Sequence, residues 1–304
     1  MRTTLLILAA LLPLAVTAAP IAVPGEELPV IPLASKPEPI PRTDRQLFEN
    51  MGFRPEAFEL VEDSPGLSFH KPMFALPYSW AENINGGENP EAFFQISFKQ
   101  RIPDIRLWGG HLFLAYTQKS FWQVYNGQAS RPFRETDYNP EAFLRWTFPQ
   151  DSSSAFGLDL GAEHESNGKA IPDSRSWNRS YAAGFWKGAR TLAYLKLWYR
   201  WPESENRAPD DPERDDNPDI NDYYGYGELQ LQHEPIRGRQ DRIGTMARFS
   251  PRTGKGAINL NYSAPIGGSY AAYWNVYFWQ GYGESLFDYN RNTMRVGVGV
   301  SFSR

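Results

Sequence analysis

Most of the chain is built from one repeated unit, a strand-length run of alternating apolar and polar side chains followed by turn residues. Successive side chains of a β-strand point to opposite faces, so this alternation predicts strands with one apolar face and one polar face. In the last run, Met294, Val296 and Val298 share one face, whereas Thr293 and Arg295 share the other. Twelve such runs are expected, at 67–80, 92–102, 106–124, 139–149, 154–165, 177–187, 190–201, 223–234, 240–250, 256–264, 269–282 and 291–302.

The connections between these runs alternate in length. The even-numbered ones are short, at 102–105, 149–153, 187–190, 235–239 and 265–268. The odd-numbered ones are mostly longer, at 81–91, 125–138, 165–176, 201–222 and 283–290, with 251–255 as the short exception. Bacterial outer-membrane barrels have an even number of strands, short periplasmic turns and longer outer loops. We therefore predict an all-β fold, a 12-stranded antiparallel transmembrane β-barrel.

Composition agrees with a barrel in a membrane. The chain has 10 Trp, 16 Tyr, 19 Phe and 25 Gly but no cysteine, so an exported form must be held together by a large core or a closed sheet. A net charge of −4, with acidic and basic residues mixed along the chain, gives no indication of a nucleic-acid partner.

The N-terminus has the features of a secretory signal peptide. Arg2 is followed by an apolar run at 5–16 and by the small residues Ala18 and Ala19, and the run is too short to span a bilayer. Seven prolines fall within 20–41, which favours an extended lead-in. We predict a signal peptide at 1–18, a Pro-rich periplasmic N-terminal segment at 19–65 and an outer-membrane β-barrel at 66–304.

A histidine and a serine at the end of one predicted strand have an unusual orientation. His164 and Ser166 share the parity of Leu158 and Leu160, so they should lie on the lipid-facing wall near the membrane surface. Spacing alone favours harmless interfacial residues over catalysis. A serine becomes a nucleophile only when a base takes its proton and a third group orients that base. Asn178, also outward, could orient the imidazole without placing a charge beside lipid.

Two further features remain open on the residues alone. Gln118 shares the outward parity of Leu112, Leu114 and Tyr116, which indicates an interfacial amide or a shifted register. The connection at 202–222 carries nine acidic and two basic residues and is interpreted as a solvated loop, since charge alone does not imply a metal site.

The sequence resembles the outer-membrane phospholipase A family. The resemblance is carried by His164-Glu165-Ser166-Asn167-Gly168 and by Ser174-Arg175-Ser176-Trp177-Asn178-Arg179. Further blocks lie in order and at compatible spacing, at 116–120, 132–136, 216–220 and 281–286. The resemblance covers about residue 69 to the C-terminus.

The resemblance implies a calcium-dependent phospholipase of the A1/A2 type, hydrolysing acyl esters of glycerophospholipids and lysophospholipids. Such a protein resides in the bacterial outer membrane, contacts its lipids and is active as a homodimer. By position, Ser166 corresponds to the nucleophile, His164 to the general base and Asn178 to its orienter. The amide of Gly168, with water held by calcium, would stabilise the oxyanion.

The resemblance also implies the Ca²⁺ ligands and the dimer contact. The ligands would be the Ser174 hydroxyl, the Lys169 carbonyl and Ser130 of the partner subunit, and Asp216 would belong to a second site in the monomer. Family members carry Asp at the position of Ile171, so this sequence departs from the pattern at the monomer site, where Asp173 is a candidate replacement. Gln118 would lie in the dimer seam.

A non-enzymatic porin or surface receptor is the rival interpretation. It accounts for the alternation and the loops equally well. It leaves unexplained why an outward His-x-Ser-x-Gly should lie beside an outward Asn178.

Overall fold

The computed structural model describes residues 58–304 apart from 205–207, 209–210, 212–213, 237–238 and 268–271. The predicted signal peptide at 1–18 and the proline-rich stretch at 20–41 lie outside the described residues. Two short helices are present in this part, η1 (Glu59–Val61) and α2 (Asn221–Tyr224). Neither is long or apolar enough to cross a membrane.

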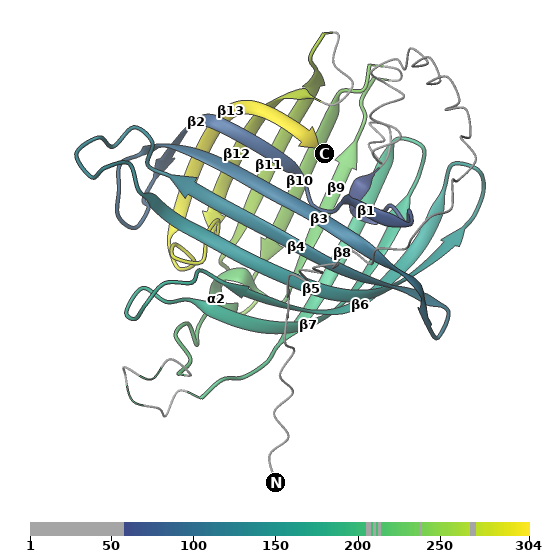
Figure 1. Cartoon of the computed structure of the whole chain (residues 1–304), viewed down its shortest axis with the longest axis horizontal. Helices are drawn as coiled ribbons and strands as arrows, with labels where there is room; N and C mark the ends of the chain where they lie inside the picture. The colour runs from purple at the N-terminus through teal and green to yellow at the C-terminus, as the bar shows by residue number, and fades with distance from the viewer. Residues whose placement is uncertain (1–57, 205–207, 209–210, 212–213, 237–238, 268–271) are drawn as a thin grey trace, which may run out of the picture. The chain divides into compact units, whose positions relative to one another are not determined.

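The strands form one antiparallel sheet that closes on itself (Figure 1). From β2 to β13, each strand pairs with its sequence neighbours, and β13 pairs with β2, so these strands make a barrel of twelve, as the sequence predicts. The short strand β1, which precedes β2 in the sequence, pairs with β3 and not with β2. The strands are β1 (Gly66–Phe69), β2 (Met73–Glu82), β3 (Pro90–Leu107), β4 (Gly110–Trp122), β5 (Phe133–Pro149), β6 (Ala155–Ser166), β7 (Ser176–Lys187), β8 (Thr191–Arg200), β9 (Gly227–His233), β10 (Arg242–Phe249), β11 (Gly256–Pro265), β12 (Tyr273–Tyr282) and β13 (Asn292–Ser303).

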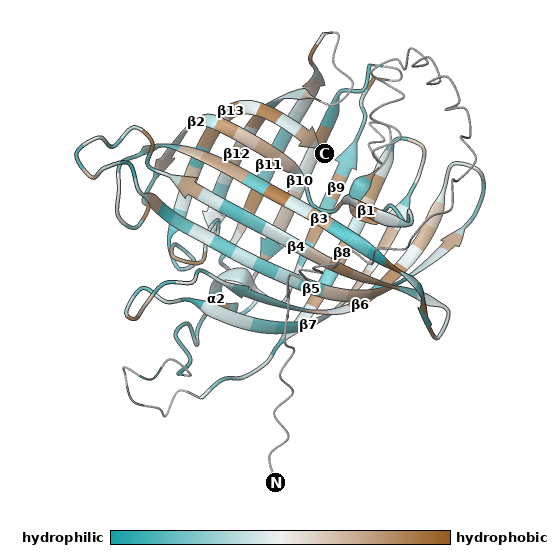
Figure 2. Ribbon diagram, viewed as in Figure 1, coloured by the Kyte–Doolittle hydropathy of each residue, from teal (hydrophilic) through white to brown (hydrophobic). Residues whose placement is uncertain are grey.

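The two faces of the wall differ as the alternation predicts. On β6, Leu158 and Leu160 are 40% and 44% exposed, whereas Asp159 between them is 1% exposed. Figure 2 shows the corresponding bands of apolar and polar residues along the strands. The exposed apolar side chains form the surface that meets lipid, and the buried charged ones point into the barrel.

Ion pairs fill much of the barrel interior. Arg145 on β5 makes two hydrogen bonds to Asp159 on β6, at 2.6 and 2.7 Å, and both side chains are buried. Glu163 is contacted by Lys196 at 2.8 Å and by Arg179 at 3.0 Å. Buried charges are stable only when paired, so these ion pairs connect nearby strands along the inner face of the wall.

The residues before the first strand also pack into this interior. Leu60 and Val61 of η1 are buried, and Lys99 of β3 donates hydrogen bonds to the carbonyls of Glu59, Leu60 (3.4 Å) and Phe69 (2.9 Å). A fully buried ammonium group needs such acceptors. Contacts with the barrel interior therefore begin ahead of the domain boundary predicted at residue 66.

The last residues take part in closing the barrel. Ser303 pairs with Met73 of β2, and the Arg304 carbonyl accepts a hydrogen bond of 2.9 Å from Arg242. The Arg304 guanidinium lies 3.6 Å from the ring centre of Tyr273. Ser303 and Arg304, which follow the aromatic Phe302, are thus both held by contacts with the barrel.

The turn predicted at 102–105 is wrong. β3 continues to Leu107, and the turn falls at Trp108 and Gly109, whose φ angles of 49° and 85° suit a type I′ hairpin. The register shifts between Arg101 and Arg106, so the strand passes Pro103 through a bulge. The sequence indicated a turn here because a proline commonly marks the end of a strand, and the bulge that accommodates Pro103 is not visible in the sequence.

Two other strand starts are also displaced. The strand predicted from residue 223 begins at Gly227, because Asn221–Tyr224 form α2 and Gly225, with a φ of 70°, ends it. β5 begins at Phe133 and not at residue 139, since Pro140 is tolerated within the strand.

Candidate active site

The β6–β7 hairpin brings the predicted catalytic residues together at the end of the barrel that carries the longer connections. His164 lies opposite Asn178 in the strand register, and Ser166 lies opposite Ser176. The side chains of His164 and Ser166 are partly exposed. Glu165, which lies between them, and Glu163, which precedes His164, are buried. His164, Ser166 and Asn178 therefore share the outer, lipid-facing side of the wall.

A hydrogen bond of 2.9 Å joins His164 Nδ1 to the amide oxygen of Asn178. An amide oxygen only accepts, so this hydrogen bond needs a proton on Nδ1, and the neutral imidazole then keeps its lone pair on Nε2. This is the tautomer that a general base needs when Nε2 faces the nucleophile. The cross-strand pair is thus compatible with a general base at His164.

Ser166 lies on the same face as His164, two residues further along β6. In the described part of the chain, no hydrogen bond joins its hydroxyl to the imidazole. Catalytic hydrogen bonds are often long without substrate and shorten only in the Michaelis complex, so the arrangement remains compatible with a nucleophile and its base.

Asn178 makes a second side-chain contact that the sequence did not indicate. Its amide nitrogen donates a hydrogen bond of 2.8 Å to Oε1 of Glu203. Burial raises the pKa of the Glu203 carboxyl above its ordinary value, and the hydrogen bond from Asn178 opposes that rise. Glu203 is one of the nine acidic residues of the 202–222 connection, so no local pattern distinguished it.

The loop from 167 to 175 is organised by Asn167, which sequence reasoning also missed. Its buried side chain donates to the Asp173 carbonyl at 2.9 Å and accepts from the Arg175 amide at 3.0 Å. Asparagine favours such local bonds to the backbone, and this was the available signal. The adjacent Gly168 has a φ of 65° and is exposed, which leaves its amide region accessible beside Ser166.

The oxygen-bearing residues predicted to bind calcium divide into three places. Ser174 donates a hydrogen bond of 2.6 Å to Asp216, whose other carboxylate oxygen accepts from the Ser176 amide at 3.0 Å. Lys169 turns its side chain away to Glu135, at 2.9 Å. Ser130 is exposed in the β4–β5 connection. The structure brings Ser174 and Asp216 together and leaves Ser130 on a separate loop.

This donor set fits a hard cation. Ca²⁺ takes several oxygen ligands, including hydroxyl, carbonyl and carboxylate oxygens, and retains water. Ser174 and Asp216 place two such oxygens 2.6 Å apart, and neither needs the side chain of Ile171, which is exposed. Within the described residues, no cluster of three or more Asp, Glu, His or Cys side chains could hold a metal ion.

Gln118 lies on the outer face of β4 in a short chain of polar contacts. Its amide accepts a hydrogen bond from the Tyr116 hydroxyl at 2.9 Å and donates one to Ser120 at 3.0 Å. An amide has two donors and two acceptor sites, so capacity remains for a further partner.

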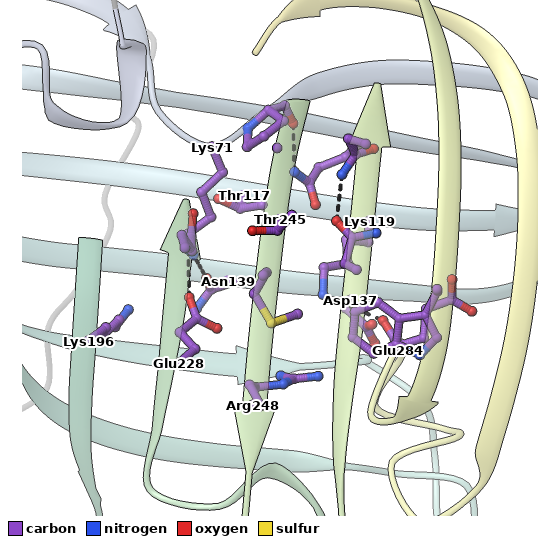
Figure 3. Close-up of a pocket in the computed structure, with 18 of the residues that line it drawn as sticks. Lys71, Thr117, Lys119, Asp137, Asn139, Lys196, Glu228, Thr245, Arg248 and Glu284 are labelled. Carbon is purple, nitrogen blue, oxygen red and sulfur yellow. Dashed lines mark hydrogen bonds between the residues drawn. The ribbon is translucent and has the colours of Figure 1, made fainter. Parts of the chain in front are cut away.

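A cavity of about 160 Å³ lies inside the barrel, behind the wall that bears the candidate site. Figure 3 shows its lining of charged and amide side chains, among them Lys71, which donates a hydrogen bond of 2.8 Å to Asn139. Its lining includes Glu163 and Glu165, whereas His164 between them faces outward. The candidate site is therefore separate from this cavity.

Residues 60–302 match the family Phospholipase A1. The chain belongs to the phospholipase A1 family. Among curated members, it is 37% identical over 233 residues to the phospholipase A1 of Escherichia coli K12, covering 73% of this chain and 72% of that protein. It is 36% identical over 262 residues to a putative phospholipase A1 of Neisseria meningitidis serogroup B, covering 78% of this chain but only 65% of the relative.

Solved structures agree with the assignment to the phospholipase A1 family. The barrel is similar to outer membrane phospholipase A from E. coli, with a TM-score of 0.69 at 31% identity, covering 78% of this chain and 98% of that one. It is equally similar to the Salmonella typhi enzyme, solved as a dimer with bound calcium, with a TM-score of 0.70 at 30% identity over 82% of this chain and 97% of that one. This phospholipase A1 family member is thus a β-barrel of the bacterial outer membrane.

Proposed function

We propose that the protein is a calcium-dependent phospholipase that hydrolyses acyl esters of glycerophospholipids and lysophospholipids from the outer wall of its barrel. The observation that carries the proposal is the 2.9 Å bond from His164 to Asn178 on a lipid-facing surface. A water-soluble substrate would have poor access to that surface, whereas a phospholipid would reach the site within its own leaflet. Membership of the phospholipase A1 family supports the reaction class.

Each residue of the proposed triad has one task. Nε2 of His164 takes the Ser166 proton as the hydroxyl attacks the ester carbonyl, and it returns that proton to the departing alcohol. Asn178 holds Nδ1–H and keeps the imidazole in place. The Gly168 amide donates to the oxyanion. Water then hydrolyses the acyl-enzyme, with His164 again acting as base.

Calcium would be held by the Ser174 hydroxyl and the Lys169 carbonyl, with Ser130 of the partner subunit, and its charge would orient water against the oxyanion. The separation of Ser130 from Ser174 within one chain supports a site completed by a second copy. Asp216 would hold calcium with Ser174 in the monomer. Dimerisation would then regulate hydrolysis.

The test is ester hydrolysis by refolded protein in mixed micelles of phospholipid and detergent. We expect activity with calcium, loss of activity with a chelator, and a loss of several orders of magnitude on Ser166→Ala. Activity that survives both treatments would overturn the mechanism. Ion conductance in planar bilayers without hydrolysis would favour the porin, which the paired charges inside the barrel disfavour.

A further inference from the structure

The side chain of Asn178 lies between an imidazole and a carboxylate. Its amide oxygen is 2.9 Å from His164 Nδ1, and its amide nitrogen is 2.8 Å from Glu203 Oε1. The two contacts use opposite ends of the amide group. Two hydrogen bonds therefore link His164 on β6, Asn178 on β7 and Glu203 in the connection after β8, and Ser166 shares the outer face with His164.

The direction of the amide decides the tautomer of the histidine. An ionised carboxylate has only acceptors, so it favours the orientation in which the amide nitrogen of Asn178 faces Glu203. The amide oxygen then faces His164, Nδ1 carries the proton, and Nε2 can accept one. With the amide reversed, its N–H₂ group would face Nδ1, and the proton would be forced onto Nε2.

Asparagine by itself does not impose this direction. Its two ends have nearly the same shape, and rotation about the terminal torsion exchanges them. An aspartate orienter has no such ambiguity, because both of its oxygens accept. In a serine protease, replacing that aspartate with asparagine lowers kcat about 10⁴-fold through the wrong tautomer. A neutral orienter therefore benefits from a neighbour that fixes its orientation.

We propose that Glu203 is a positioning residue, which holds the Asn178 amide in the orientation that keeps His164 Nε2 free to act as base. The inference rests on the proposed function and adds a residue to its machinery. Glu203 acts only through Asn178 and does not touch the substrate.

The backbone keeps Glu203 within reach of Asn178. The Trp201 amide donates a hydrogen bond of 2.8 Å to the Asn178 carbonyl, which fixes the chain as it leaves β8. Arg200 binds Asp215 at 2.6 Å, and the Asp215 amide donates to the Ser204 carbonyl at 3.0 Å. These contacts join both ends of the long connection beside β7 and place Glu203 at its start.

The test compares kcat and KM for the full-length wild type, Glu203→Gln and Glu203→Ala in the same calcium-containing micelles. Glutamine keeps the size of glutamate but can donate or accept, so it no longer selects one orientation. We expect kcat to fall about tenfold at unchanged KM in both variants, the loss expected for one charge-assisted hydrogen bond. Glu88→Gln, in the exposed loop between β2 and β3, is the matched control and should remain at the wild-type level.

A reversal of sign distinguishes positioning from a general structural role. In the Asn178→Asp background the orienter has two acceptor oxygens and no longer needs Glu203, and the two carboxylates repel each other. Glu203→Gln should therefore raise kcat in that background, although it lowers kcat in the wild type. Equal losses in both backgrounds, or an unchanged kcat in the wild type, would overturn the inference. Ser166→Ala reports separately on the proposed function, because its activity would persist only if that function were wrong.

Discussion

Gln118 and Ser166 lie in one register row of the barrel wall, separated by Tyr138 of β5. Neighbouring strands are about 4.8 Å apart, so the backbones of the two residues are roughly 10 Å apart. A second barrel that docks along Gln118 would thus reach the substrate held at Ser166. This adjacency supports the proposal that dimerisation controls hydrolysis.

Gln118→Leu should weaken the dimer. The substitution removes an amide that can bond across the seam, and hydrogen bonds between membrane segments contribute about 0.6 to 1.7 kcal/mol, or about threefold to twentyfold in the dimerisation constant. Calcium-dependent crosslinking at several protein concentrations measures the shift. Activity should recover at high protein density.

Gln280→Leu is the control for this substitution. Gln280 on β12 also has a partly exposed side-chain amide. It donates a hydrogen bond of 2.7 Å to Asn292 on the neighbouring strand β13. Its strand, β12, is separated from β4, the strand of Gln118, by β3, β2 and β13 in the order around the barrel. If both substitutions weaken the dimer equally, the seam does not run along β4.

Ile171→Asp should increase the affinity of the monomer for calcium. Ile171 is exposed, so the change costs little stability, and it adds an anionic oxygen three residues before Ser174, which is bonded to Asp216. We expect about a tenfold lower Kd, the effect of roughly 1.4 kcal/mol, in a calcium titration of the monomer followed by tryptophan fluorescence. Ile171→Asn, without the charge, should give a smaller gain. A full gain from Ile171→Asp that persists together with Asp216→Asn would place the ion elsewhere.

Arg145→Met should destabilise the barrel more than removal of both members of the pair. The single change leaves Asp159 buried without its cation and should cost about 3–5 kcal/mol. Arg145→Met with Asp159→Leu removes both charges and should recover part of that loss. Guanidinium unfolding in detergent micelles, read by tryptophan fluorescence, compares them. A double variant as unstable as the sum of its single changes would exclude coupling.

A chain that begins at residue 66 should unfold more readily than one that begins at residue 58. The shorter chain loses the Glu59 and Leu60 carbonyls that accept from buried Lys99. Lys99 would keep only the Phe69 carbonyl among its three acceptors, and a buried polar group that loses hydrogen-bond partners costs about 1–3 kcal/mol. The denaturant midpoints of the two truncated forms, measured beside that of the full-length protein, give this difference. Equal midpoints would support the boundary predicted at residue 66.

Alternation and connection lengths were sufficient to predict the barrel, since both follow from a wall with lipid on one side. They also placed His164 and Ser166 on the outer face, because parity is fixed once the neighbouring leucines are assigned. The strand ends were less predictable. Pro103 and Pro140 lie within strands because a bulge or an unpaired position accommodates them, and neither is visible in a local pattern.

Contacts between distant segments were beyond sequence reasoning. Glu203 meets Asn178 only because the chain leaving β8 is bonded to β7. Lys99 is bonded to the carbonyls of Glu59 and Leu60, which the sequence assigned to the N-terminal segment at 19–65 and not to the barrel. The roles of Ser166, Gly168 and the calcium ligands came from family resemblance, and they remain predictions for the experiments above.

The outward position of His164 and Ser166 means that a lipid substrate would reach them by diffusion in the two dimensions of the membrane. A site on a lipid-facing wall samples molecules by lateral diffusion, so its supply is measured per unit area of leaflet and not per volume of medium. Dilution of the surrounding solution leaves that supply unchanged. Crowding of barrels in the plane, and the arrival of phospholipid in their leaflet, would therefore control the rate.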